Sequence, residues 1–295
     1  MKTILFKAGL IATGSLCLLA CANVFANPDV TTREYKLLLN PTLFTYTTES
    51  TQVNSYFSAF VAAVEAKIAR DVSGSLSLDK TRTVKFYDTA GSCQLNDLGY
   101  IFRDRIENGQ SEVTLKFRSA DPYIADFEDL SASSNQAETK LEADIGAKAD
   151  NPFVIVYGHS TTSPNTRTIN NFEDINVHFP GFDVDYGISD STALALVGNL
   201  SIYERVYDGG LIDLGSIDAE VSLALWYSSV PTASQKPVVV EVSFKYEDAS
   251  ADYTKAVVNR AKQSFDAMQT LSSWNSTSSV TKTQFVYGYN PAFCN

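Results

Sequence analysis

The feature that most constrains the fold is a segment with two strand-like pieces, each carrying two cations two residues apart. The first piece has Arg103 and Arg105, and the second has Lys116 and Arg118. Successive side chains of a strand point to opposite faces, so both members of each pair share one face. The Asn-Gly dipeptide at 108–109 is typical of a tight hairpin turn. The segment therefore predicts a β-hairpin with four cations on one face.

The other face of the second piece is apolar, with Val113, Leu115 and Phe117. Four cations on one face repel one another unless anions lie between them. The chain as a whole has a net charge of −11, which argues against a general binder of nucleic acids or anionic membranes. With only two histidines, the composition also excludes a His-based metal site. The hairpin therefore predicts either interleaved carboxylates or a polyanionic ligand.

The first residues have the composition of a targeting segment. Lys2 precedes an uncharged apolar run over 8–20, and a small-x-small pattern at 24–26 fits a cleavage site. These features predict a signal peptide over 1–26. They also predict a single exported domain over 27–295, in the periplasm or secreted.

A second interpretation of the N-terminus stays open, because residues 18–21 resemble a bacterial lipobox that would place a lipid anchor on Cys21. No later stretch is long and apolar enough to span a bilayer. Cys93 and Cys294 are the cysteines that survive signal removal under either interpretation. Two such cysteines in an oxidising compartment predict one disulfide, which would tie the approach to the hairpin to the C-terminus.

Hydrophobic periodicity predicts the secondary structure along the chain. Strands are expected at 32–39, 84–88, 152–157, 200–207, 216–227, 238–246 and 281–287. Amphipathic helices are expected at 52–70 and 252–271, a helical or mobile connection at 121–151, a polar turn region at 160–171, and an irregular acidic segment at 172–190. The pattern predicts an α+β fold, a mostly antiparallel closed or nearly closed β-barrel with covering helices. The two helices argue against an outer-membrane barrel.

Several residues around the hairpin follow the order of a known family motif. They are Tyr87-Asp88-Thr89, Leu95 or Leu98, Gly99, Arg103-x-Arg105 and Thr114-Leu115-Lys116. This order resembles the CYTH domain of the triphosphate tunnel metalloenzymes. The resemblance implies a triphosphate-tunnel-like barrel whose interior cations hold a triphosphate or polyphosphate. It also implies carboxylates that hold Mg²⁺ or Mn²⁺.

The resemblance further implies roles for individual residues. The phosphate-binding positions are Lys36, Arg103, Arg105, Lys116 and Arg118, with Arg205 as a further candidate from a later strand. The metal positions are Glu34 and Glu241. Two acidic positions of the family motif are altered, to Thr32 and Ser243, and this removes two carboxylates from the expected metal site.

Loss of two carboxylates weakens a site for a hard divalent metal, whereas the phosphate-binding cations are retained. We therefore expect a small polyanion as the ligand, a triphosphate or polyphosphate, and no nucleic acid. Three functions stay open: metal-dependent hydrolysis of a phosphoanhydride, non-catalytic binding on the same barrel, and a structural envelope protein whose cations pair with internal acids. No pattern in the sequence indicates an oligomeric state.

Overall fold

The computed structural model describes residues 28–148, 150–278 and 280–295. In this part of the chain the strands are β1 (Thr32–Leu39), β2 (Val72–Asp88), β3 (Tyr100–Glu107), β4 (Gln110–Ser119), β5 (Glu138–Lys148), β6 (Asn151–Pro164), β7 (Ala195–Leu196), β8 (Ile202–Asp213), β9 (Asp218–Tyr227) and β10 (Val239–Glu247). The α-helices are α1 (Glu49–Ile68), α2 (Gln94–Asp97), α3 (Pro122–Phe127), α4 (Phe172–His178), α5 (Pro180–Tyr186), α6 (Lys255–Gln269) and α7 (Lys282–Tyr289). None of these helices has the length and apolarity needed to cross a membrane. The expected signal peptide over 1–26 and Cys21 lie outside the described residues.

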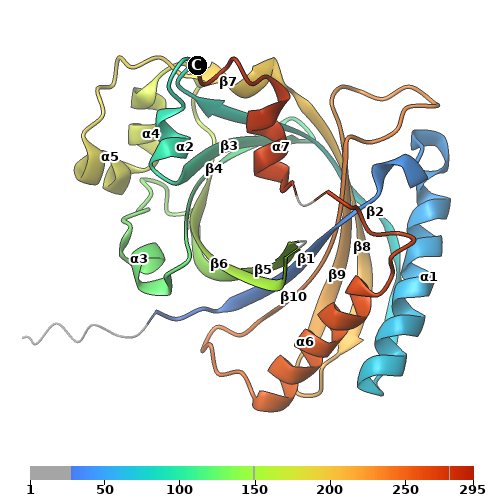
Figure 1. Cartoon of the computed structure of the whole chain (residues 1–295). Helices are drawn as coiled ribbons and strands as arrows, with labels where there is room; N and C mark the ends of the chain where they lie inside the picture. Colours follow the sequence, from blue (N-terminus) through green and yellow to red (C-terminus); the bar gives the residue numbers. More distant parts are fainter. Residues whose placement is uncertain (1–27, 149, 279) are drawn as a thin grey trace, which may run out of the picture.

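These strands form one sheet, in the order β3-β4-β6-β5-β1-β10-β9-β8-β2-β7. β1 and β5 pair in parallel, and the other pairings are antiparallel. β2 also pairs with β3, the first strand of the order, so the strands from β3 to β2 form a ring, and the short β7 pairs with the end of β2 (Figure 1). The predicted α+β class and the mostly antiparallel pairing are confirmed.

Two long helices cover the ring from outside, beside β8, β9 and β10 (Figure 1). The apolar stripe of α1 includes Val53, Phe60 and Val64, which belong to one buried cluster with the outer side of these strands. α6 contributes Phe265 and Met268 to the same cluster. The two helices expected from the apolar spacing are therefore confirmed, with ends that differ by less than one helical turn.

The cationic hairpin forms as predicted from β3 and β4. Asn108 and Gly109 have φ angles of 50° and 80°, the left-handed values that a tight hairpin turn requires. The apolar side of β4 packs outward against α4 and α5, in a cluster that contains Val113, Leu115, Phe117, Phe172, Phe179 and Phe182. The expectation of an irregular segment at 172–190 is wrong, because Asn171 and Asp174 form a capping box that starts α4.

The stretch 121–151 also differs from expectation, since it contains β5. Its apolar residues Leu141, Ala143 and Ile145 are buried on the outer side of the ring, and the acidic residues between them point inward. The expectation of a helical connection is confirmed only for α3, whereas from Glu138 onward the chain is the strand β5, whose acids pair with cations inside the ring. β6 likewise continues through Pro164, into the region expected as a polar turn.

The segment 281–287, expected as a strand, is the helix α7. The backbone N–H of Gln284 donates to the Thr281 hydroxyl at 3.2 Å, and the Thr281 N–H donates to the Gln284 side chain at 2.9 Å. This capping box starts a helix despite the alternation of polar and apolar residues. α7 lies inside the ring (Figure 1). The predicted disulfide between Cys93 and Cys294 is confirmed, with Cα atoms 5.1 Å apart.

Candidate functional site

The polar residues of several strands share the inner face of the ring, as the strand register shows. Glu34 lies opposite Asp144, and Arg103 lies opposite both Thr114 and Phe86. Directly opposite residues of paired strands point to the same face, so these side chains lie on the face turned away from α1, α4, α5 and α6. The same register and alternation place the following charged residues inside the ring: Lys36, Arg82, Arg105, Lys116, Arg118, Glu142, Glu204 and Glu241.

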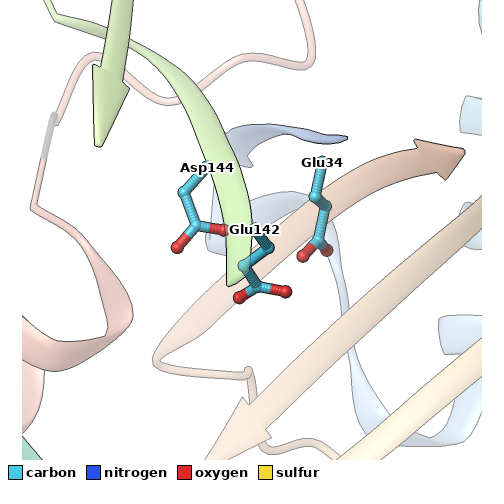
Figure 2. Close-up of side chains that lie close together, drawn as sticks. All are labelled: Glu34, Glu142 and Asp144. Atoms are coloured by element: carbon cyan, nitrogen blue, oxygen red, sulfur yellow. The ribbon is translucent and has the colours of Figure 1, made fainter. Parts of the chain in front are cut away.

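One group inside the ring combines three carboxylates with two lysines. Glu34 on β1 and Glu142 and Asp144 on β5 bring their carboxylates together (Figure 2). The Lys36 ammonium lies 2.8 Å from the Glu34 carboxylate and 2.7 Å from that of Asp144. The Lys116 ammonium contacts Glu142 and lies 3.0 Å from Asp144. The group is therefore a network of ion pairs that bridges β1, β4 and β5.

A glycine beside Lys116 and the opposite charges of the neighbouring side chains both stabilise this network. A Cβ at Gly158 would lie 2.4 Å from Lys116 Cε, so glycine at this position leaves room for the lysine. Burial would raise the pKa of Asp144, but the charges of Lys116, Lys36 and Arg118 hold it well below its ordinary value of 3.8. Burial would lower the pKa of Lys36, but its carboxylate neighbours, Asp144 first, raise it well above its ordinary value. Asp144 and Lys36 are therefore both charged at neutral pH.

The three carboxylates have the ligand type that a hard divalent cation requires. One oxygen from each lies within 4.8 Å of the others. Of the two expected metal positions, Glu34 belongs to this group. Glu241 is not part of this group, and its carboxylate lies 2.9 Å from the ammonium of Lys282. Glu142 and Asp144 were missed, although the alternation of acidic and apolar residues along β5 is a signal that could have identified them.

Arg103 and Arg105 differ from the lysines because, within the described part of the chain, neither forms an ion pair. The Nε–H group of each is buried and has no hydrogen-bond partner there, while Arg103 Nη2 donates to the Thr114 hydroxyl at 3.3 Å. Burial, followed by repulsion from Arg105, lowers the pKa of Arg103 well below its ordinary value. Burial also lowers the pKa of Arg105 to about 10, against the attraction of Glu204. A guanidinium stays protonated at neutral pH, so these are two positive charges without a counter-ion.

Glu204 on β8 and Glu241 on β10 are already paired with other cations. Arg82 contacts Glu204, and the indole N–H of Trp226 donates to the same carboxylate at 2.7 Å. Lys282 of α7 lies 3.7 Å from Glu204 and 2.9 Å from Glu241. Burial would raise the pKa of Glu204, but Lys282 and two arginines hold it well below its ordinary value of 4.5.

The structure does not bring Arg205 to the other expected phosphate-binding residues. Arg205 lies on the outer face of β8, where its guanidinium contacts Glu49 of α1 and lies 5.2 Å from the centre of the Tyr46 ring. Its neighbour Glu204 takes the inward position. Strand alternation puts these two residues on opposite faces, and the packing of α1 decides which face is the outer one.

A surface pocket at one end of β2, β8 and β9 has the opposite electrostatic character. Its volume is about 440 Å³, and Asp71, Asp213 and Asp218 contribute to its walls. Carboxylates in these walls repel a polyanion, and the nearby cation Arg70 already pairs with Asp213 at 2.8 Å. The inner face of the ring is therefore the better candidate for the expected polyanion.

No family model matches the sequence, and no curated protein matches it. Several solved structures are similar to the chain. A candidate adenylyl cyclase from Hippeastrum, described with a dominant triphosphatase activity, is 12% identical with a TM-score of 0.41, and the match covers 88% of this chain and 96% of that chain. A candidate adenylate cyclase from Bacillus halodurans is 11% identical with a TM-score of 0.36, and the match covers 81% of this chain and 92% of that chain. The PH1819 protein from Pyrococcus horikoshii is 8% identical with a TM-score of 0.35, and the match covers 81% of this chain and 89% of that chain. At these identities and TM-scores, the similarity assigns neither a family nor a function to this chain.

Proposed function

We propose that the inside of the ring binds a triphosphate or a short polyphosphate. The observation that carries this proposal is the pair Arg103 and Arg105, which lie inside the ring without a carboxylate partner among the described residues. A charge removed from water without a partner is unfavourable, and a bound polyanion would supply the counter-charge. Guanidinium groups suit this ligand because they donate two parallel hydrogen bonds to phosphate oxygens.

The neighbouring cations extend this site along three strands. Arg118 lies 3.7 Å from Asp144 and donates to the Thr283 hydroxyl at 3.2 Å, and Lys116 and Lys36 follow on β4 and β1. A chain of phosphates carries several negative charges and can engage cations from β1, β3 and β4 together. A single phosphate can engage fewer of them. The arrangement therefore favours a phosphate chain over inorganic phosphate.

Metal-assisted hydrolysis of a phosphoanhydride is a second candidate function, favoured by the carboxylate group of Glu34, Glu142 and Asp144. Lys36 and Lys116 neutralise these acids in the ligand-free protein. A phosphate chain that attracts both lysines would leave the carboxylates available to hold Mg²⁺ or Mn²⁺. A divalent ion bound there would neutralise phosphate charge and polarise a phosphoryl oxygen.

We also propose that the protein is an exported CYTH-like protein of the periplasm or the extracellular space. The signal-like composition of residues 1–26 supports export. The disulfide between Cys93 and Cys294 supports an oxidising compartment. A lipid anchor on Cys21 is the alternative form of this proposal, and intact mass measurement of the protein from native membranes distinguishes the two.

Thermal unfolding with tripolyphosphate tests the binding proposal, because a ligand that binds only the folded state raises the Tm. At a ligand concentration about 100 times Kd, we expect a stabilisation of roughly 2.7 kcal/mol and a rise of several degrees. Sodium sulfate at equal ionic strength is the ligand control. The double variant Arg103→Ala, Arg105→Ala should lose the rise, and the surface variant Arg70→Ala should keep it. An equal rise in the double variant would exclude these arginines as the site.

Hydrolysis is tested on the same samples by following phosphate release with and without Mg²⁺ or Mn²⁺. A Tm rise that grows with metal, together with release of phosphate, supports the enzymatic candidate. A metal-independent rise without release supports a binding protein. No rise under any condition would refute both candidates and leave the cations as part of an internal ion-pair network.

A further inference from the structure

α7 lies inside the ring and covers the part of its inner face that is apolar (Figure 1). Val286 of α7 is buried in a cluster with inner side chains of β2, β3, β8, β9 and β10. These side chains are Val84, Phe86, Ile101, Ile202, Trp226 and Val239. Without α7 this apolar surface would be exposed to water inside the ring, so packing of the helix against it stabilises the fold.

Three further attachments hold α7 in this position. The Tyr287 hydroxyl donates to the buried carboxylate of Asp88 at 2.9 Å. Arg118 donates to the hydroxyl of Thr283 at 3.2 Å, which connects the first turn of α7 to the cationic hairpin. The disulfide to Cys93 fixes the chain that follows the helix. The position of the first turn of α7 inside the ring is therefore well defined.

Lys282 is the residue that this first turn presents to the charged interior. Its ammonium lies 2.9 Å from Glu241, 3.7 Å from Glu204, and 5.0 Å from the centre of the Trp226 ring. In the described residues, Lys282 is the cation that pairs with Glu241. Glu204 has Arg82 as a second partner. Loss of the Lys282 charge would therefore leave Glu241 without its ion pair and weaken the neutralisation of Glu204.

Of these two carboxylates, Glu204 would compete with a polyanion for Arg103 and Arg105. Only β2 separates Glu204 on β8 from Arg103 and Arg105 on β3, and the charge of Glu204 acts to raise the pKa of each arginine. Uncompensated carboxylates would pair with the free guanidinium groups and would repel phosphate. A cation that neutralises the carboxylates keeps the guanidinium groups available.

We propose that Lys282 is a positioning residue of the anion site: it neutralises Glu204, which would otherwise pair with Arg103 and Arg105, and Glu241, which would otherwise repel the phosphate chain. This inference rests on the proposed function, since it assigns a role in the binding of the same phosphate chain. It makes α7, together with its disulfide, a determinant of affinity for a ligand that Lys282 itself does not contact.

A charge-rescue series on the full-length protein tests this role by isothermal titration with tripolyphosphate. Lys282→Gln should bind at least about tenfold more weakly than wild type, which corresponds to about 1.4 kcal/mol. Lys282→Arg keeps the charge and should bind within about threefold of wild type. Adding Glu241→Gln to Lys282→Gln removes the uncompensated acid and should restore most of the lost affinity.

Each result separates this role from its alternatives. If Lys282→Gln binds as wild type does, the inference is wrong. If the double variant stays as weak as Lys282→Gln, Lys282 contacts the phosphate directly or supports only the structure, and the positioning role is overturned. Should Lys282→Gln fail to fold, Lys282→Met retains the aliphatic stem against Trp226 and takes its place. Absence of wild-type binding would overturn the proposed function together with this inference, whereas wild-type binding with no rescue overturns the inference alone.

Discussion

The inner face of the ring has an apolar half and a charged half, and the two differ in whether their side chains have partners within the protein. In the apolar half, Val84, Phe86, Ile202, Trp226 and Val239 are covered by Val286 of α7. In the charged half, the lysines of β1 and β4 pair with the acids of β1 and β5, while two arginines of β3 have no acidic partner among the described residues. The protein completes the apolar half with its own helix α7, whereas in the charged half the proposed anion would supply the missing counter-charge.

This difference separates stability from function within one ring. Burial of the apolar half releases water from hydrocarbon surface and stabilises the folded chain. The unpaired guanidinium groups contribute unfavourably to folding, and under the proposed function their role is to bind the ligand. Variants in the apolar half should therefore lower the free energy of unfolding, whereas variants of the two arginines should lower ligand affinity without lowering the free energy of unfolding.

The largest expected effect is in the apolar half, where Val286→Asp places a carboxylate in a site that is 1% exposed. An unpaired buried charge should reduce the free energy of unfolding by about 4 kcal/mol. Urea denaturation measures this loss. Val280→Asp is the matched control, because Val280 precedes the same helix and is 44% exposed. Equal losses in the two variants would show that Val286 is not packed inside the ring.

An intermediate effect is expected from the acids of the charged half when pH falls. Asp144 has a folded pKa below its ordinary 3.8, so its ion pairs stabilise the fold above that pH and are lost as pH falls through the folded value. Between about pH 5 and pH 2, wild type should therefore lose roughly 2 kcal/mol that Asp144→Asn does not lose. Urea denaturation over this range measures the difference. Asp150→Asn, at an exposed position, should retain the wild-type slope, and a wild-type slope in Asp144→Asn would contradict the ion-pair network.

The smallest effect, and one of opposite sign, is expected for Arg103→Ala combined with Arg105→Ala. Because the pKa of each arginine is lowered, the folded state disfavours its charge at neutral pH. The ligand-free double variant should be as stable as wild type or more stable by up to about 1 kcal/mol, although it no longer binds tripolyphosphate. Urea denaturation tests this, with Lys36→Met as the contrasting variant that breaks ion pairs and lowers stability. A loss above about 2 kcal/mol in the double variant would mean that the arginines have internal partners.

The charged half was largely predictable from local patterns. The two-residue spacing of Arg103 and Arg105, the apolar alternation of β4 and the Asn-Gly turn specify the hairpin because each of these signals acts within a few residues. Cys93 and Cys294 were predictable as a pair because signal removal leaves no certain third cysteine. The acids of β5 were missed, since a strand rich in Glu and Asp resembles a solvated connection until a partner strand places lysines opposite it.

The apolar half was not predictable in the same way. α7 has a strand-like alternation, and only the capping box of Thr281 and Gln284 indicated a helix. Its position inside the ring depends on contacts with residues about 40 to 200 positions away, such as Asp88 and Glu241. The role of Lys282 follows from that position and from no motif.

By itself, the sequence determined which residues share a strand face, where the hairpin turns, and that an acidic chain concentrates cations in one short segment. The tertiary structure decided which face is the inner one. α1 covers the side of β8 that carries Arg205, and this turns Glu204 inward. The tertiary structure also decided that Glu142 and Asp144, rather than Glu241, form the carboxylate group with Glu34. The physical reason is that alternation is a local property of the backbone, whereas the choice of face depends on where distant apolar residues and counter-charges find one another.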